Sequence, residues 1–502
     1  MKLQELVRGI SCSWNGEGSF DIPVRGVHAD SRKIKKGDVF VAIRGVQTDG
    51  HLFIKDVLKK SPAAIFSENC EDYIRQKRIP HFRVLDSRRA FAVVIANIYG
   101  TPTDKLSLVG ITGTNGKTTT SFLIQYMLNR VSKAGLIGTV HYDDGKKKRS
   151  ADNTTPGAEL LNEQLNEMVK NGLSYCVMEV SSHALDQRRV EGLRFRDAIF
   201  TNLTQDHFDY HKDFENYYQA KKKLFTNLPL PERAIINTED QYGVRLAQEL
   251  KKTKVITYGF SPDCDYYADQ ISENLSEIEF ILCRRKNRLR VKVPLQLRYN
   301  VLNVLAALAY VDNQGFALET MVEFLTKFPG VSGRMERIDV GQAFHVFVDY
   351  AHTPDAIENV LLAVKRLPCN RIISVVGCGG NRDRDKRPKM GAAAERYSDI
   401  LILTSDNPRG EDPLKILEDV KKGIGVGERK IQVLILPDRT EAIQRAVEIA
   451  DEGDMILIFG KGHENYQIIG KEKIPFSDQN VVRYALKERL RGKRHSKGLD
   501  KK

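Results

Sequence analysis

The chain has 502 residues, 41% of them hydrophobic and 28% charged, which is a balance typical of a folded globular protein. At about 150 residues per domain, this length predicts roughly three domains and excludes a single small module. The formal net charge is +13, but the sequence has no recognisable nucleic-acid module and no stripe of alternating basic and aromatic residues. We therefore expect no nucleic acid partner and favour a cleft for strongly anionic small molecules.

Hydropathy and cysteine usage bound the location of the protein. The longest apolar runs, such as residues 90–96, are far shorter than the ~18 residues that a membrane helix needs. The first ten residues contain no apolar h-region, and the seven cysteines are scattered without a C-x-x-C pair. We expect a cytoplasmic protein without membrane insertion or disulfides, which acts as a monomer.

Residues 1–103 are predicted to form a small α/β domain. They contain short β-like runs at 38–45, 63–68 and 81–85 and one helical stretch before "YGTPTD". That segment, marked by proline and glycine, reads as a linker to the next domain.

Residues 104–331 show a repeated strand–loop–helix pattern. Continuous apolar runs of this kind, with helical stretches between them, are typical of a mostly parallel sheet. The predicted strands lie at 106–112, 134–140, 175–181, 197–203, 233–239 and 254–260.

The alternation restarts over residues 332–502. The predicted strands lie at 344–352, 371–380, 399–410, 431–437 and 454–464, and each runs into a polar or glycine-rich loop. This pattern predicts a Rossmann-like, doubly wound C-terminal domain. The basic stretch at about 491–502 is expected to be a tail without regular structure. Polar motifs should therefore gather at the carboxyl edges of parallel sheets, where open α/β sheets bind ligands.

The segment "GITGTNGKTTT" (110–120) lies between a predicted strand and a predicted helix, as a phosphate-binding loop does. Its first glycine is displaced by one position from the usual pattern. Gly113 and Gly116 would allow backbone N–H groups to approach phosphate oxygens, Lys117 would reach the terminal phosphates, and Thr118 would bind Mg²⁺. The alternative, a glycine-rich turn without a ligand, is disfavoured by the G-K-T sequence in this setting.

Three further motifs in the central region are ambiguous on their own. Glu179 ends a predicted strand and could bind Mg²⁺ or be a satisfied surface carboxylate. His207 lies among acids after another strand and could be structural or a ligand of a second metal; a zinc site is less favoured, because no cysteine pair or H-x-x-x-H helix accompanies it. The lysines of "AKKKLF" (220–225) read, by composition, as an exposed helix face.

Two loops of the C-terminal region could hold an amino acid. Arg409 can grip a carboxylate with two hydrogen bonds, and Glu464 can bind an ammonium group. A helix-capping role for Asp406 and Asn407 is an equal alternative.

Taken together and in this order, the motifs resemble those of the Mur ligases over nearly the whole chain, from residue 30 to about 480. The motifs that carry the resemblance are "GITGTNGKTTT", "NTTPG" (153–157), "MEVSSHALDQRRV" (178–190), "NLTQDHFDYH" (202–211), "YYQAKKKLF" (217–225), "GRMERI" (333–338), "DYAHTPDA" (349–356), "GCGGNRDRDKRP" (377–388), "TSDNPRGEDP" (404–413) and "GKGHENYQ" (460–467). The loop of this family has the displaced first glycine.

The resemblance implies three domains: an N-terminal UDP-binding domain, a central P-loop ATPase-type domain and a C-terminal Rossmann-like domain for the incoming amino acid. It implies that ATP phosphorylates the carboxylate of UDP-N-acetylmuramoyl-L-alanyl-D-glutamate, and that the amine of meso-2,6-diaminopimelate attacks the acyl phosphate. The implied cofactors are ATP and Mg²⁺.

The resemblance also assigns residues. For ATP these are Gly113, Thr114, Asn115, Gly116, Lys117, Thr118, Thr119, Asn303, Arg334, Asp349 and His352. For the UDP-muramoyl dipeptide they are Ala29, Ser31, Gln47, Asn153, Thr154, Thr155, Ser181, Gln187 and Arg189. For diaminopimelate they are Arg382, Asp406, Asn407, Pro408, Arg409, Gly460 and Glu464. For metal they are Thr118, Glu179, His207 and Lys221, the last as a carbamate (N6-carboxylysine), and the catalytic set is Lys117, Lys221, Glu179 and His207.

The D-N-P-R sequence ending at Arg409 favours diaminopimelate over L-lysine, because only diaminopimelate carries a carboxylate on its far carbon. A lysine-adding ligase is the nearest alternative, and a folate polyglutamylating enzyme would lack "DNPR" and "GKGHE". A P-loop nucleotide-binding protein without ligase activity, or a basic nucleic-acid protein that uses ATP, would have no use for the amino-acid loops. Two positions depart from the family pattern: Leu297 stands where the family usually has glycine, and Ser332 where it commonly has proline.

Overall fold

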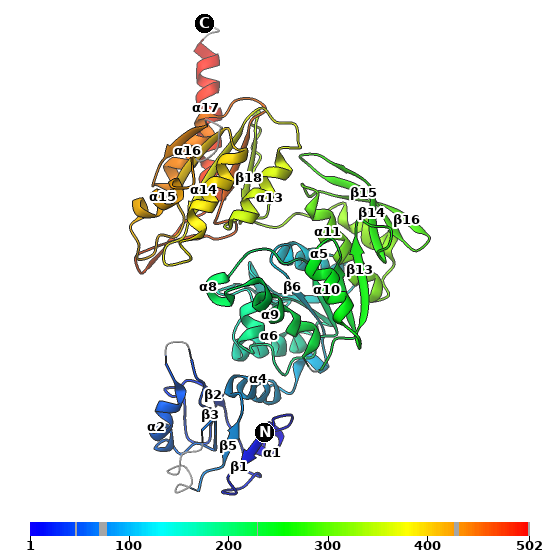
Figure 1. The fold of residues 1–502 in the computed structure, drawn as a ribbon, viewed down its shortest axis with the longest axis vertical. Helices are drawn as coiled ribbons and strands as arrows, with labels where there is room; N and C mark the ends of the chain where they lie inside the picture. The colour runs from blue at the N-terminus through cyan, green and yellow to red at the C-terminus, as the bar shows by residue number, and fades with distance from the viewer. Residues whose placement is uncertain (46–47, 70–77, 228, 426–430, 500–502) are drawn as a thin grey trace.

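The computed structural model describes residues 1–45, 48–69, 78–227, 229–425 and 431–499. Three α/β lobes follow one another along the long axis of the molecule, with the N-terminal lobe at one end and the C-terminal lobe at the other (Figure 1). Each lobe has its own sheet. Within the described ranges, no helix combines the length and apolar character needed to cross a bilayer.

The N-terminal lobe is built on a five-stranded sheet of order β1-β5-β4-β3-β2. Only β1 is antiparallel to its neighbour. The strands are β1 (Cys12–Trp14), β2 (Val27–His28), β3 (Val39–Val41), β4 (Ala64–Ser67) and β5 (His81–Val84). The helices are α1 (Leu3–Leu6), η1 (Gly50–Phe53), α2 (Ile54–Leu58) and α4 (Ser87–Ile98), and η2 (Pro102–Asp104) follows at the linker.

The central lobe contains an eleven-stranded sheet of order β16-β15-β14-β13-β12-β11-β6-β10-β7-β8-β9. Its middle is parallel, as predicted from the continuous apolar runs. The parallel strands are β6 (Ser107–Thr112), β7 (Ala134–Ile137), β10 (Tyr175–Glu179), β11 (Asp197–Phe200), β12 (Arg233–Asn237) and β13 (Lys254–Gly259). The remaining strands are β8 (His141–Asp143), β9 (Lys148–Ser150), β14 (Tyr266–Glu273), β15 (Ile278–Arg284) and β16 (Asn287–Val293). At one edge β14 joins β13 in parallel and is followed by antiparallel β15 and β16, and at the other edge β8 and β9 are added antiparallel to β7.

Helices cover both faces of the central sheet, because successive residues of a buried strand point to opposite faces. Val109 and Ile111 of β6 pack into one core with α5, α11 and α12, whereas Leu108 packs into the other core with α6 and α9. The helices are α5 (Lys117–Val131), α6 (Ala158–Lys170), α7 (Ser182–Asp186), α8 (Phe208–His211), α9 (Phe214–Thr226), α10 (Gln241–Glu249), α11 (Tyr299–Asn313) and α12 (Leu318–Leu325).

The C-terminal lobe has a six-stranded sheet of order β17-β18-β22-β19-β20-β21, parallel except for β17. The strands are β17 (Glu336–Arg337), β18 (His345–Asp349), β19 (Ile372–Cys378), β20 (Ile400–Ser405), β21 (Gln432–Ile435) and β22 (Met455–Phe459), with the hairpin β23 (Tyr466–Ile469) and β24 (Glu472–Pro475) after them. The helices are α13 (Pro354–Val364), α14 (Lys386–Tyr397), α15 (Pro413–Lys421), α16 (Arg439–Ile449) and α17 (Asp478–Leu499).

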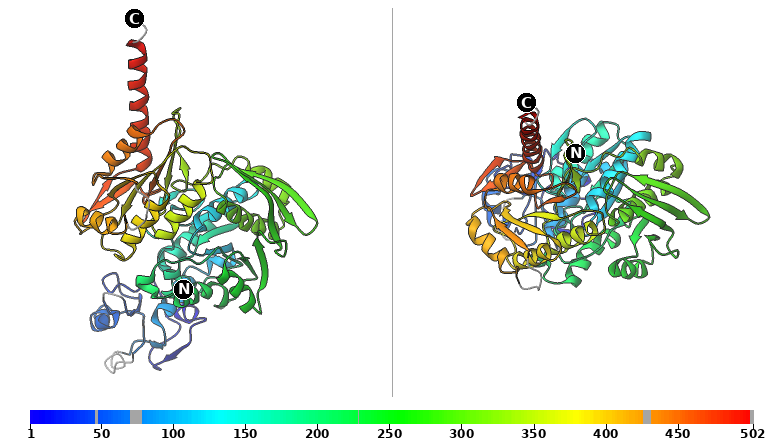
Figure 2. Two further views of the ribbon diagram at one scale, coloured as in Figure 1. Left: turned by 45° about the horizontal axis from the view of Figure 1, so that its top comes forward. Right: turned by 90° about the horizontal axis from the view of Figure 1, so that it is seen from above.

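The expectation of an irregular basic tail from about residue 491 is wrong. Helix α17 continues to Leu499 and projects away from the C-terminal lobe (Figures 1 and 2). Residues 491–499 (RGKRHSKGL) contain no proline to stop the helix, but they include two glycines, so helix propensity alone does not account for the extension.

Leu297 links the central and C-terminal lobes. It is fully buried, has a backbone φ of 68°, and belongs to the hydrophobic core that also contains Phe347 of β18 and Ile357 of α13. A leucine in this left-handed region is strained by about 1–2 kcal/mol. The position therefore has the backbone conformation that glycine adopts easily, and the leucine side chain extends the C-terminal core toward the central lobe.

Candidate active site

The loop between β6 and α5 is packed too closely for side chains at its glycines. Gly116 has a φ of 86°, and a Cβ atom there would lie 2.3 Å from Oδ1 of Asn303. A Cβ on Gly113 would lie 1.9 Å from Oγ1 of Thr201. Asn303, which was assigned to ATP, therefore lies directly against the loop at Gly116, its third glycine.

Lys117 folds back over this loop. Its Nζ donates to the carbonyl oxygens of Gly113 at 2.9 Å and Thr114 at 2.8 Å. Burial lowers the pKa of Lys117, although Glu179 and Asp206 oppose the shift. The amine is thus held at the start of α5, where backbone N–H groups favour an anion.

Glu179 lies at the end of β10 and is fully buried, which excludes a surface carboxylate. It accepts hydrogen bonds from Thr118 Oγ1 at 2.9 Å and from the Oγ1 and N of Thr139, each at 2.9 Å. A buried carboxylate beside two hydroxyl oxygens is the hard, all-oxygen donor set that Mg²⁺ prefers. Thr119, next on α5, is also buried.

The prediction from composition that Lys221 lies on an exposed helix face is wrong. Lys221 lies on α9 with 1% of its surface exposed, and its Nζ donates to the Gly113 carbonyl at 2.7 Å and lies 4.4 Å from the centre of the Tyr217 ring. Burial and the nearby Lys117 lower the pKa of Lys221 well below its usual value. The structure thus places a readily deprotonated amine at the phosphate loop.

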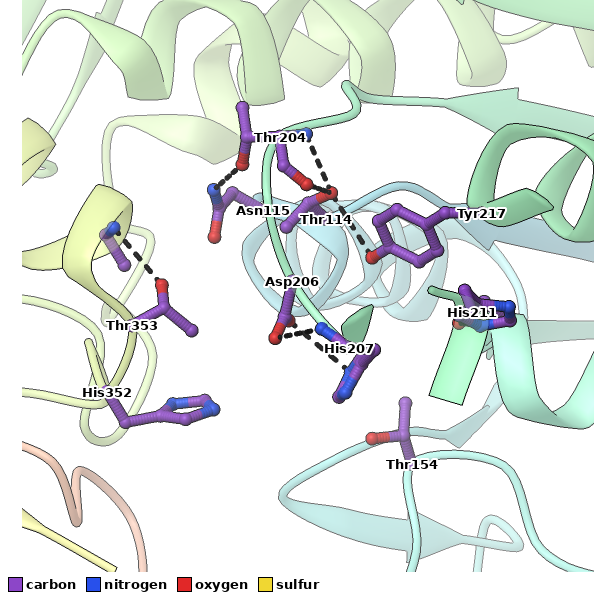
Figure 3. A network of polar contacts seen from close by, with 12 residues as sticks. Thr114, Asn115, Thr154, Thr204, Asp206, His207, His211, Tyr217, His352 and Thr353 are labelled. Atoms are coloured by element: carbon purple, nitrogen blue, oxygen red, sulfur yellow. Dashed lines mark hydrogen bonds and ion pairs between the residues drawn. The ribbon is translucent and has the colours of Figure 1, made fainter. Parts of the chain in front are cut away.

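His207 follows β11 and has a left-handed backbone, with φ at 54°. Its Nε2 lies 3.4 Å from Asp206 Oδ2 (Figure 3). Its ring is 4.7 Å from that of His183. Desolvation lowers the pKa of His207 to about 4, against the attraction of Asp206. The imidazole is therefore neutral near pH 7, as a metal ligand must be.

Three predicted ATP residues come from the C-terminal lobe. Arg334 donates from Nη2 to Thr118 Oγ1 at 3.1 Å and lies 4.7 Å from the centre of the Tyr350 ring. Asp349 accepts from the backbone N of Met335 at 2.7 Å, and burial raises the pKa of its carboxyl group. His352 points toward the side of the site where Asp206 and His207 lie (Figure 3).

One carboxylate joins this lobe to the phosphate loop. Asp355, in the first turn of α13, accepts from Thr204 Oγ1 at 2.8 Å and from Asn115 Nδ2 at 3.4 Å. Asn115 in turn is a loop residue whose backbone N donates to Asn202 Oδ1 at 2.9 Å. The orientation of the C-terminal lobe is thus coupled to the loop itself.

The residues assigned to the muramoyl dipeptide gather beside Glu179. Thr155 donates from Oγ1 to the Glu179 carbonyl at 2.8 Å, and Ser181 caps α7. Arg189 donates to the Thr155 carbonyl at 2.9 Å and to Gln187 Oε1 at 2.7 Å. Burial lowers the pKa of Arg189. These contacts place a guanidinium beside Thr155, whose hydroxyl is bonded to the Glu179 carbonyl.

Two neighbouring assigned residues complete this side of the site. Thr154 Oγ1 lies 3.1 Å from Thr139 Oγ1, and the carbonyl of Asn153 accepts from Tyr142. Both precede Thr155 on the segment that leads into α6.

The residues that the resemblance assigns to the UDP sugar belong to the N-terminal lobe. Ala29 and Ser31 follow β2, at the carboxyl end of that strand, and are partly exposed. His28, beside them, lies 3.6 Å from Glu159 of α6, so this edge faces the central lobe. Gln47 lies outside the described residues.

Most of the residues assigned to the incoming amino acid lie close together in the loops after β20 and β22. Asn407 donates from Nδ2 to Glu464 Oε2 at 2.9 Å, and Gly460 approaches so closely that a Cβ would lie 2.6 Å from Asp406 Oδ2. Arg409, with φ at 53°, donates from Nη1 to the Gly380 carbonyl at 2.9 Å. Burial, followed by the nearby Arg382, lowers the pKa of the Arg409 guanidinium.

The capping alternative for Asp406 and Asn407 is excluded, because Asp412 caps the next helix, α15. Pro408 is buried, and its carbonyl oxygen packs so closely against Gly380 that a Cβ there would lie only 1.9 Å away. Arg382 is exposed at the rim of the cluster, and its only described hydrogen bond is a 3.5 Å contact to the Asn381 carbonyl.

Sequence reasoning missed several residues of this site. Thr139 and Asp355 were inside recognised segments but carry no motif signature of their own. Lys461, inside "GKGHE", is fully buried among the amino-acid residues. A signal did exist for Lys221: it lies four residues from both Tyr217 and Phe225, on the buried stripe of α9.

Family models match three parts of the chain. They are described as Mur ligase family, catalytic domain (residues 23–99), Mur ligase middle domain (residues 111–311) and Mur ligase, glutamate ligase domain (residues 333–462). Together they cover parts of all three lobes.

Similar proteins share the full length of the chain. A protein of Clostridium tetani named UDP-N-acetylmuramoyl-L-alanyl-D-glutamate--2,6-diaminopimelate ligase is 41% identical over 492 residues, covering 97% of this chain and 100% of its own length. A protein of Geobacillus thermodenitrificans with the same name is 42% identical over 496 residues, with the same coverage of 97% and 100%. A solved structure titled with this name superimposes with a TM-score of 0.70 at 33% identity and covers 98% of this chain and 99% of that one.

Proposed function

The chain belongs to the Mur ligase family, and we propose that it is the ATP-dependent ligase that adds meso-2,6-diaminopimelate to UDP-N-acetylmuramoyl-L-alanyl-D-glutamate. In this role it supplies a precursor of peptidoglycan in the cytoplasm. The N-terminal domain, residues 1–103, binds the UDP sugar. Residues 104–331 bind ATP, and residues 332–502 bind the incoming amino acid.

The observation that carries this proposal is the cluster of Asn407, Arg409 and Glu464. It combines a fixed amide, a guanidinium and a carboxylate at the carboxyl edge of a parallel sheet. A carboxylate and an ammonium group on one carbon match these charges, and diaminopimelate carries such a group at its far end. L-lysine has only an ammonium there and would leave Arg409 unpaired.

The central domain performs the activation step. The residues 113–118 hold the phosphates of ATP, and Lys117 offsets the charge on the phosphoryl group as it passes to the substrate carboxylate. Thr118, Glu179 and His207 would hold Mg²⁺, which when bound neutralises phosphate charge. Arg189 and Ser181 hold the muramoyl dipeptide so that its terminal carboxylate faces the loop.

We infer that Lys221 acts as a carbamate. A buried, neutral amine forms an N–C bond with CO₂ and releases one proton, which converts a cation into a carboxylate-like group. That group would lie beside Lys117 and within reach of the metal ligands. The neutral amine of diaminopimelate then attacks the acyl carbon, the new C–N bond forms, the C–O bond to phosphate breaks so that phosphate leaves, and the nitrogen loses one proton.

The test is phosphate release from ATP in the presence of each substrate alone and of both together. We expect release only when the UDP-muramoyl dipeptide and meso-diaminopimelate are both present, with a product heavier by one diaminopimelate residue in mass spectrometry. Turnover that is equal with L-lysine would overturn the assignment of the amino acid. Release without any amino acid would overturn the ligase assignment.

A further inference from the structure

Lys461 lies in the loop after β22 and none of its surface is exposed. An ammonium group that is fully removed from water is costly unless partners surround it. The partners of Lys461 are all residues of the amino-acid cluster, although its own side chain is not assigned to any ligand.

The contacts of Lys461 are specific. Its Nζ donates to Glu464 Oε2 at 2.9 Å and to Asn407 Oδ1 at 3.2 Å. Asp406 Oδ1 lies 3.9 Å away, and the centre of the Tyr466 ring lies 5.4 Å away. One side chain of the protein thus touches the carboxylate, the amide and the second carboxylate of this cluster.

These contacts fix the orientation of Asn407. Its Oδ1 accepts from Lys461 Nζ and from the backbone N of Ile468 at 2.9 Å, while its Nδ2 donates to Glu464 Oε2 at 2.9 Å. A rotated amide would point its NH₂ group at two donors and its oxygen at a carboxylate. Among the described residues, the hydrogen bonds to the Glu464 carboxylate all use Oε2, which leaves Oε1 for a ligand.

The two carboxylates of the cluster share one fully buried cation. Lys461 Nζ lies 2.9 Å from Glu464 and 3.9 Å from Asp406, whereas Arg382 is exposed at the rim and Arg409 donates to the Gly380 carbonyl. With Lys461 in place, the charge of Glu464 is partly offset, so a ligand ammonium gains less there and a zwitterionic end that also meets Arg409 is favoured. Without Lys461 the charge of Glu464 would lose this buried cation, and a ligand end that carries only an ammonium would bind relatively better.

We propose that Lys461 is a positioning residue that sets the preference of this site for a zwitterionic amino-acid end over a simple ammonium end. It does so by fixing Glu464 and Asn407 and by balancing the charge of Glu464. This inference rests on the proposed function, because it concerns the same amino-acid site.

The test compares Lys461→Met with a matched control, Lys473→Met. Lys473 also lies against the Tyr466 ring, at 3.8 Å from its centre, but it is exposed on β24. Steady-state kcat/KM is measured with meso-diaminopimelate and with L-lysine, together with the KM values for ATP and for the UDP-muramoyl dipeptide.

For Lys461→Met we expect the ratio of kcat/KM for diaminopimelate over lysine to fall about tenfold or more, with the KM for ATP unchanged. Lys473→Met should keep the wild-type ratio. A ratio that stays constant while both activities fall together would show a merely structural role and overturn the inference. Wild-type enzyme that does not use diaminopimelate at all would overturn the proposed function instead.

Should Lys461→Met fail to fold, Lys461→Gln is used. The glutamine keeps a polar group that can donate to Glu464 and Asn407, but it removes the charge. The ratio must then fall relative to the wild type, and an unchanged ratio in this folded variant also overturns the inference.

Discussion

Replacing Arg409 by lysine removes the fork of the guanidinium while it keeps a positive charge. Nη1 of Arg409 donates to the carbonyls of Gly380 at 2.9 Å and Asn407 at 3.4 Å. Among the described residues, the side-chain hydrogen bonds of Arg409 all use Nη1, so Nε and Nη2 are left to bind the two oxygens of a carboxylate. Both arginine and lysine meet the same backbone strain at a φ of 53°, so the substitution tests the side chain alone.

The expected loss of kcat/KM with diaminopimelate follows from the loss of one charged hydrogen bond. Such bonds contribute about 1.5–3 kcal/mol each. A lysine can keep one of the two bonds to the far carboxylate of diaminopimelate, so kcat/KM should fall about 10- to 150-fold, at about 1.4 kcal/mol per tenfold. With L-lysine as substrate no such carboxylate exists, and kcat/KM should not fall.

The assay is phosphate release at limiting amino acid, with meso-diaminopimelate and L-lysine measured in parallel. Arg396→Lys on the exposed face of α14 serves as the control, because it changes the same residue type away from the loops. The reasoning fails if Arg409→Lys lowers both activities by the same factor, or if diaminopimelate turnover equals that of the wild type.

Three further outcomes are expected. Lys221→Ala should abolish turnover, and added bicarbonate should not restore it, since no amine remains to be carbamylated; full activity in the phosphate-release assay would contradict the carbamate. Leu297→Gly should destabilise the protein less than Leu297→Ala, by about 1 kcal/mol in denaturant unfolding, because only glycine relieves the strain at a φ of 68°; the usual order, with alanine the milder change, would contradict it. The free energy of unfolding should fall as the pH drops from about 6.5 to about 4, because burial lowers the pKa of His211 to about 4 in the folded protein. In that window the unfolded chain binds more protons than the folded one, and this one group accounts for at most about 3 kcal/mol. His211→Gln should flatten this part of the pH profile of thermal unfolding, and an unchanged slope would assign it to other groups.

Much of the fold was predictable because the parallel strands are continuous apolar runs that end in glycine-rich or polar loops. The antiparallel strands β14, β15 and β16 were missed. Their exposed residues alternate with buried ones and include many charges, for example along Asn287–Val293, so no continuous apolar run marks them. Helix α17 was missed at its end because the charge density and the two glycines of residues 491–499 suggested a tail, whereas the helix continues to Leu499.

The candidate site was predictable where chemistry lies in a short motif, and less so where tertiary packing decides. The phosphate loop and the D-N-P-R segment follow strands and Glu179 ends one, so the sequence placed all three at strand ends, although it left the role of Glu179 open. Which of the lysines in "AKKKLF" faces inward depends on helical phase, and only Lys221 lies on the apolar stripe of α9. The role of Lys461 could not be predicted, because its partners Asn407 and Glu464 meet it only after β20 and β22 enter the same sheet.

The hydrogen bonds of the Asp355 carboxylate couple the affinities of the protein for its nucleotide and for its amino acid. This carboxylate belongs to the C-terminal lobe, yet it accepts hydrogen bonds from Thr204 and Asn115 at the nucleotide loop. A nucleotide that repositions Asn115 changes the free energy of lobe docking, and an amino acid that fixes the C-terminal lobe changes the free energy of the loop. Because such linkage is reciprocal, each ligand alters the affinity of the other by the same factor, without any contact between the two molecules.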